Sequence, residues 1–137
     1  MSLLLDTGFL YALLNRTEQN HERVFAVTRT IHEAVILPVP AITEVAYLLL
    51  RDVGSEAVAD FIGSLAATDL VLESPQIADY LRAAAVIRQY GDARIDFVDA
   101  VIVAIAERLS ITRILTLDVR HFAMFRPSHC AGFELLP

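Results

Sequence analysis

The chain has 137 residues, 55% of them apolar, a mean hydropathy of +0.52 and a formal net charge of −6. This size suits one compact domain over residues 1–137, and the acidic balance disfavours nonspecific binding of nucleic acid through a broad basic surface. All 11 basic residues are arginine, so recognition of phosphate would depend on local arginine side chains. The single cysteine, Cys130, excludes an intrachain disulfide and a thiolate metal cluster.

No apolar run reaches the roughly 18–20 residues that span a bilayer. The longest run, Ala100 to Ala106, is bounded by Asp99 and Glu107. The N-terminus lacks the basic region and cleavage site typical of a signal peptide. We therefore expect a cytoplasmic globular domain without membrane contact, with enough apolar residues for a self-association surface as well as a core.

Short apolar runs alternate with amphipathic segments along the whole chain. Strands are expected at residues 2–5, 34–38, 70–73, 113–118 and 132–136. Helices are expected at residues 7–14, 20–33, 40–53, 56–67, 75–90 and 96–109. Such alternation implies right-handed crossovers between parallel strands. The predicted fold class is α/β, a three-layer sandwich with a central, mainly parallel sheet of about five short strands flanked by helices.

Local signals mark the ends of several of these helices. Ser74 and Pro75 are the expected N-cap and first-turn proline of the helix at 75–90. Gly54 and Gly91 follow apolar periodic segments and are expected to end them.

Four acidic side chains are expected at one edge of this sheet. Asp6 directly follows the first strand, and Asp118 ends the fourth. Asp99 lies in the first turn of the apolar helix at 96–109, and Glu44 lies early in the helix after the second strand. Ligand sites in parallel α/β sheets gather outside the carboxyl ends of the strands, so these carboxylates are predicted to meet there.

A cluster of carboxylates repels itself unless a positive group lies among them. Hard divalent cations, Mg²⁺ above all, take oxygen ligands and can activate water beside a phosphoryl group. This combination fits hydrolysis of phosphodiester bonds without a serine, cysteine or histidine nucleophile. Thr7 and Thr116 flank two of the acids, and their hydroxyls are candidates for supporting hydrogen bonds to metal ligands.

Each acid also has a structural interpretation when it is taken alone. Asp6 and Asp118 could cap strand ends or helix starts, and Glu44 could be a solvated helix residue. Asp96 and Asp99 are three residues apart, as in a capping box. Only the coincidence of four acids in matching positions favours the metal site.

The four histidines show no ligand spacing and are expected on the surface or in loops. One of them, His121, is close enough to Asp118 along the chain to touch substrate. The glycines are scattered, so no phosphate-binding loop is predicted.

Four blocks of the sequence together resemble the PIN-domain ribonucleases, and more narrowly the VapC-type toxins of toxin–antitoxin pairs. The blocks are "LLLDTGFLYALLN", "PAITEVAYLL", "RIDFVDAVIVAIAERL" and "ILTLDVRHF". Their acids in chain order are Asp6, Glu44, Asp99 and Asp118. The resemblance covers nearly the whole chain, and "DTG" alone would carry little weight.

The resemblance implies an endoribonuclease that depends on Mg²⁺ or Mn²⁺ and hydrolyses RNA with a metal-activated water. The four acids would be the catalytic metal ligands, with Asp96 as a lower-ranked alternative to Asp99. A homodimer and a small cognate antitoxin protein are implied as partners, with RNA as substrate. Arg120, beside Asp118, is a candidate for RNA contact, as are Arg16 and Arg94.

Several alternatives stay open at this point. A stand-alone nuclease that processes RNA or DNA would share the same residues, and a non-catalytic binding module could keep them for structure alone. A dehalogenase-type phosphatase is disfavoured because it needs a second aspartate where this chain has Gly8. The RNA target, the number of metal ions and the identity of any antitoxin are not predicted.

Overall fold

Five parallel strands form the central sheet of the computed structural model, which describes residues 1–137. They are β1 (Ser2–Leu5), β2 (Ala34–Pro38), β3 (Val71–Glu73), β4 (Arg113–Leu115) and β5 (Glu134–Leu136). Their order is β3-β2-β1-β4-β5, and every neighbouring pair is parallel. The predicted strands and the parallel α/β class are confirmed, although β4 ends before Thr116. The strand order reverses between β1 and β4, where ligand sites of such sheets are found.

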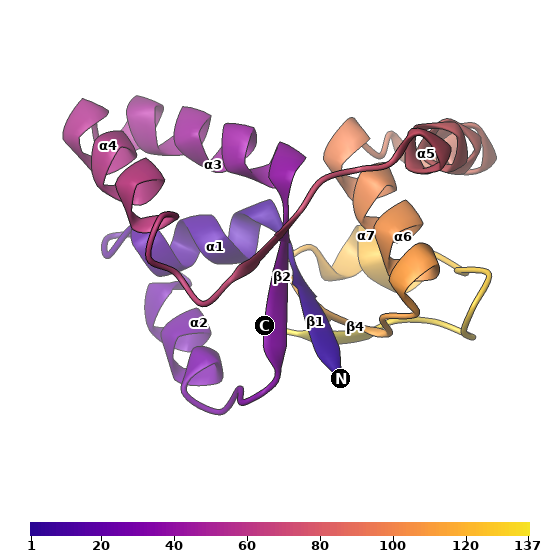
Figure 1. Cartoon of the computed structure of the whole chain (residues 1–137), viewed down its shortest axis with the longest axis horizontal. Helices are drawn as coiled ribbons and strands as arrows, with labels where there is room; N and C mark the ends of the chain where they lie inside the picture. Colours follow the sequence, from indigo (N-terminus) through magenta and orange to yellow (C-terminus); the bar gives the residue numbers. More distant parts are fainter.

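Seven α-helices and one short 3₁₀ helix, η1, surround the sheet. They are α1 (Thr7–Leu14), α2 (His21–Thr28), α3 (Val39–Asp52), α4 (Ser55–Ser64), α5 (Ile77–Gln89), η1 (Gly91–Ala93), α6 (Phe97–Leu109) and α7 (Val119–Met124). Figure 1 shows α1 to α4 on one side of the sheet and α5 to α7 on the other. The expected three-layer arrangement is therefore confirmed. No helix combines the length and hydropathy that crossing a membrane would need.

The core lies around β1 and α6. Leu3, Leu4 and Leu5 are at most 3% exposed, as expected for a central strand covered on both faces. Every residue of α6 from Val98 to Ala106 is buried, because the helix packs against the sheet on one side and α5 on another. This burial fixes the start of α6, and with it the side chain of Asp99, deep at the carboxyl edge of the sheet.

Helix α2 is shorter than the predicted segment at 20–33. The hydroxyls of Thr28 and Thr30 donate to the carbonyls of Phe25 and Val27 at 2.6 and 2.7 Å. The backbone N–H of Thr30 also donates to the carbonyl of Val27, which tightens the last turn. Side chains that bond to nearby backbone compete with helix continuation, so α2 ends at Thr28.

The predicted N-cap of α5 was wrong. Gln76, not Ser74, caps the helix, and Ser74 and Pro75 lie before it. The Asp79 carboxylate accepts from the Gln76 backbone N–H at 2.8 Å while the Gln76 side chain accepts from the Asp79 N–H. Asp79 also forms an ion pair with Arg108 of α6. This long-range contact favours a helix that starts at Ile77, two residues later than predicted.

Candidate functional site

Four carboxylates meet in one cavity at the carboxyl end of the sheet. The cavity measures about 530 Å³ and is lined by residues near the starts of α3 and α6. These two helices lie on opposite sides of the sheet (Figure 1). The four residues, called the acidic cluster below, are Asp6, Glu44, Asp99 and Asp118. The structure thus brings together all four acids that the sequence placed at one edge. Asp96 lines the same cavity.

Asp6 comes from the end of β1 and caps α1. Its carboxylate accepts from the Thr7 backbone N–H at 2.8 Å and from the Thr116 hydroxyl at 2.7 Å. The side chain is buried, and loss of solvation raises its pKa from 3.8 to about 6, against the lowering effect of these hydrogen bonds. Asp6 is therefore a fixed carboxylate in an environment that disfavours its charge.

Thr116 joins Asp6 to Asp118. While its hydroxyl donates to Asp6, it also accepts from the backbone N–H of Asp118 at 2.9 Å. Asp118 then caps α7, a helix that the sequence did not predict, by accepting from the His121 backbone N–H at 3.1 Å. This turn after β4 explains why the strand ends before Thr116.

Asp99 lies in the first turn of α6 and is 8% exposed. Asp96 is the N-cap of this helix and accepts from the Asp99 backbone N–H at 2.9 Å, so the capping role foreseen for Asp96 is confirmed. Burial, followed by the negative charges of Asp96, Asp6 and Asp118, raises the pKa of Asp99 to about 8. A proton or a cation is needed to balance the negative charge of these carboxylates at neutral pH.

Glu44 reaches the cavity from α3 on the opposite side. The hydroxyl of Thr7 donates to the Glu44 carboxylate at 3.1 Å. Partial burial and the charge of Asp96 raise the pKa of Glu44 above its usual range. Thr7 thus holds two acids at once, Asp6 through its backbone N–H and Glu44 through its hydroxyl.

A histidine and an arginine also line the cavity. His121, the one histidine expected to lie near Asp118, lines the cavity from α7 and not from a loop. Arg94 has a left-handed backbone (φ 56°) at the end of η1 and is the basic residue closest in sequence to Asp96. Arg16 and Arg120 are exposed and are not among the residues that line the cavity.

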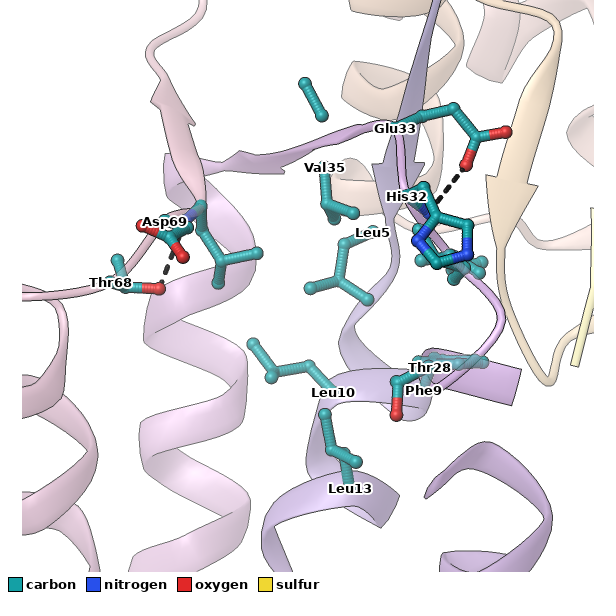
Figure 2. Close-up of a pocket in the computed structure, with 14 residues that line it drawn as sticks. Leu5, Phe9, Leu10, Leu13, Thr28, His32, Glu33, Val35, Thr68 and Asp69 are labelled. Carbon is teal, nitrogen blue, oxygen red and sulfur yellow. Dashed lines mark hydrogen bonds between the residues drawn. The ribbon is translucent and has the colours of Figure 1, made fainter. Parts of the chain in front are cut away.

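A second cavity, of about 570 Å³, has a different character (Figure 2). It lies on the α1 side of the sheet and is lined mainly by apolar side chains, with Leu5, Leu10 and Leu13 among them. Among its polar groups, the His32 backbone N–H donates to the Glu33 carboxylate, which also accepts from the Arg113 guanidinium. No group of carboxylates meets there, so the cavity of the acidic cluster is the candidate for chemistry.

Comparison with known proteins agrees with this geometry. The family model described as PIN domain matches residues 3–125. Ribonuclease VapC26 of Mycobacterium tuberculosis is 30% identical over 135 residues, which span 98% of this chain and 100% of that protein.

Two solved structures share the fold at lower identity. The crystal structure of Mycobacterium tuberculosis VapC20, described as a toxin that cleaves the sarcin–ricin loop, has a TM-score of 0.77 at 20% identity and covers 82% of this chain and 86% of its own. A toxin–antitoxin complex from Klebsiella pneumoniae has a TM-score of 0.68 at 16% identity, and the match covers 90% of this chain and 92% of the matched chain.

The match to the PIN domain family model spans most of the sequence and contains all four acids of the cluster. The chain therefore belongs to the PIN domain family.

Proposed function

We propose that this protein is an endoribonuclease that depends on a divalent metal ion and hydrolyses phosphodiester bonds of RNA. The observation that carries the proposal is the meeting of the acidic cluster in one cavity at the carboxyl edge of the sheet. Membership of the PIN domain family and the likeness to Ribonuclease VapC26 support the same class of reaction.

The donor set of the cavity fits Mg²⁺ or Mn²⁺. Both ions prefer oxygen ligands, which the carboxylates supply. The raised pKa values of Asp6 and Asp99 arise from burial and from negative neighbours, and a bound cation would offset both effects. The acidic cluster would hold the ion, with Asp96 as the alternative ligand at the start of α6.

Each surrounding residue has a defined part in this proposal. A divalent ion, when bound, lowers the pKa of a water and neutralises charge that develops on a phosphoryl group. The hydroxyls of Thr116 and Thr7 hold Asp6 and Glu44 in fixed orientations. Arg94 lines the cavity, and its guanidinium would contact a substrate phosphate. Arg120 is exposed on α7, two residues after Asp118, and is a candidate for RNA contact.

Replacing Thr116 by valine tests the supporting hydrogen bonds. Thr116→Val keeps the shape of a fully buried side chain but removes the donor to Asp6 and the acceptor for the Asp118 N–H. We expect affinity for Mn²⁺ to fall by roughly 10- to 100-fold, the usual cost of losing an outer-shell partner. Calorimetric titration measures the affinity for Mn²⁺, with Thr30→Val, at an exposed position just after α2, as the control. Equal affinities in the two variants would contradict a supporting role for Thr116.

Cleavage by the wild-type protein tests the reaction and its substrate class. Labelled RNA and DNA of the same sequence are incubated with Mg²⁺, with Mn²⁺ or with EDTA. Internal cleavage of RNA with either metal, and none with EDTA, is the expected result. Cleavage that survives EDTA, or no cleavage with either metal, would overturn the proposal, and preferred cleavage of DNA would change the substrate class.

We propose further that the protein acts as the toxin of a toxin–antitoxin pair and is held inactive by a small partner protein. The support is the likeness to the Klebsiella pneumoniae toxin–antitoxin complex and to VapBC2 of Rickettsia felis, solved with a DNA fragment from its promoter, at a TM-score of 0.70 and 12% identity. Co-purification of a small protein that suppresses cleavage is the expected result. A protein that is isolated alone and is harmless when expressed would favour a stand-alone processing nuclease.

We also propose that the protein forms a homodimer through an apolar face of α5. Ile77 and Leu81 are 78% and 73% exposed there, and Tyr80 stacks on the half-exposed Phe97 of α6. In a two-fold dimer this face would meet its own copy. Leu81→Glu should convert the dimer to a monomer in light scattering, whereas Ile62→Glu on α4 should not. A monomeric wild type, or a Leu81→Glu variant that stays dimeric, would contradict the interface.

A further inference from the structure

We infer that His121 is a nitrogen ligand of the cation site, beside Asp99 and Asp118, and that it biases the site toward Mn²⁺ over Mg²⁺. The inference rests on the proposed function, because it takes the acidic cluster as the place where a divalent cation binds. It adds a non-carboxylate donor to that site and concerns which ion the site prefers.

The positions of the donor atoms fit a shared ion. His121 Nδ1 lies 2.8 Å from Asp118 Oδ2 and 3.8 Å from Asp99 Oδ2. One donor atom from each of the three residues can be chosen so that all lie within 4.8 Å of one another. In an octahedral site with bonds near 2.1 Å, adjacent ligand atoms are about 3 Å apart and opposed atoms about 4.2 Å apart. The observed separations need only small adjustments to reach this geometry.

The other ring nitrogen is held as a ligand histidine requires. Nε2 lies 3.1 Å from the carbonyl oxygen of Ala93, which can only accept, so Nε2 carries the proton of that hydrogen bond. Histidines that bind metals usually donate their second N–H to a carbonyl or a carboxylate, which fixes the orientation of the ring. The Ala93 carbonyl belongs to η1, 28 residues away from His121 in sequence, so this hydrogen bond is a tertiary contact.

The contact on the opposite side of the ring leaves two possibilities. With Nε2 protonated, Nδ1 faces two carboxylate oxygens, and two lone pairs in contact repel each other. Either a proton or a cation must therefore lie between Nδ1 and the acids. A proton would make His121 a hydrogen-bond donor that orients Asp118, whereas a cation would make His121 a ligand.

The choice of donor affects the choice of ion. Mg²⁺ is bound almost entirely through oxygen and keeps several waters, whereas an imidazole nitrogen favours transition-metal ions. A site with Asp99, Asp118 and His121 as neighbours should therefore bind Mn²⁺ more tightly than a purely carboxylate site would. Removal of the imidazole should lower affinity for Mn²⁺ more than affinity for Mg²⁺.

Pulsed electron paramagnetic resonance on bound Mn²⁺ tests the ligand directly. The whole protein is prepared with ¹⁵N-labelled histidine, loaded with Mn²⁺ and measured by electron spin echo envelope modulation. We expect modulation from a directly coordinated ¹⁵N nucleus in the wild type and its loss in His121→Gln. The modulation should be retained in His32→Gln, because His32 is exposed and does not line the cavity of the acidic cluster. Calorimetry on the same proteins should show a loss of Mn²⁺ affinity of about tenfold or more in His121→Gln, with a smaller loss for Mg²⁺.

The outcomes separate this inference from the proposal beneath it. If Mn²⁺ binds without ¹⁵N modulation, His121 is not a ligand and the carboxylate nuclease site still stands. Modulation that persists in His121→Gln would equally overturn the inference. If no Mn²⁺ binds at all, both the ligand role and the proposed metal-dependent function fail. The ¹⁵N modulation is measured first on the wild-type protein, so this result does not depend on whether His121→Gln folds.

Discussion

Asp99→Asn is expected to lower RNA cleavage by at least about 100-fold, because it removes a charged ligand and even outer-shell losses cost 10- to 100-fold. Asp99 is the most perturbed member of the acidic cluster, with a pKa of about 8 caused by burial and three acidic neighbours. The asparagine has the same shape, so the loss would reflect charge and not packing. Single-turnover cleavage of a labelled RNA measures the effect.

Asp96→Asn provides the matched comparison for Asp99→Asn. Asp96 is exposed and caps α6, and asparagine is an equally good N-cap, so the loss should be less than about tenfold. Glu22→Gln, on an exposed position in the first turn of α2, should leave cleavage unchanged. A larger loss for Asp96→Asn than for Asp99→Asn would show that Asp96 is the ligand at the start of α6.

The second large effect concerns stability and pH. The pKa of Asp99 is higher in the folded chain than its ordinary value of 3.8, so the folded state holds this proton more tightly than the unfolded state does. Between about pH 4 and pH 8 the unfolded chain therefore loses the proton first, and the wild type loses stability as the pH rises through this range. Below pH 4 both states are protonated, and the effect disappears.

Asp99→Asn should remove this pH-dependent cost. In EDTA at pH 7 we expect its free energy of unfolding to exceed that of the wild type by on the order of 2 kcal/mol. A tenfold change in acidity corresponds to about 1.4 kcal/mol, so the full shift would give roughly 4 kcal/mol, and solvent in the open cavity screens the charge and reduces this by about half. The difference should shrink toward zero near pH 4. Urea unfolding followed by circular dichroism at several pH values measures it.

Addition of metal should reverse the order of the two proteins. Mn²⁺ at 100 times its Kd stabilises a folded protein by about 2.7 kcal/mol, and Asp99→Asn should gain little of this. The wild type is thus expected to be the less stable protein in EDTA and the more stable one in Mn²⁺. If the variant is the less stable protein in both conditions, the strain attributed to the acidic cluster is absent.

The positions of the acids were predictable because a simple rule connects chain order to space in a parallel sheet. Asp6 and Asp118 follow β1 and β4, Glu44 lies near the start of the helix after β2, and Asp99 lies at the start of the helix before β4, so all four reach the carboxyl edge. The apolar strands themselves were recognised from composition, because strands covered on both faces contain little else. The order of strands and the pairing of β1 with β4 agree with this layout.

The features that were missed depend on contacts between distant segments. The later start of α5 depends on the pairing of Asp79 with Arg108, 29 residues away. The position of His121 depends on a turn that Thr116 stabilises and on the Ala93 carbonyl 28 residues earlier. No local pattern around either residue contains this information. Spacing along the chain therefore identified the acids and placed His121 near Asp118, but it did not predict α7 or the contacts that hold the imidazole against the acids.

Binding of Mn²⁺ in the crystal tests the central claim most directly. The wild-type protein is crystallised with Mn²⁺ at a concentration that supports RNA cleavage, and anomalous differences are measured at the manganese edge. We predict a peak about 2.0–2.6 Å from carboxylate oxygens of the acidic cluster, including Asp99 and Asp118. A fully cleavage-competent protein with no manganese peak among these carboxylates would contradict the assignment of the acidic cluster as the catalytic metal site.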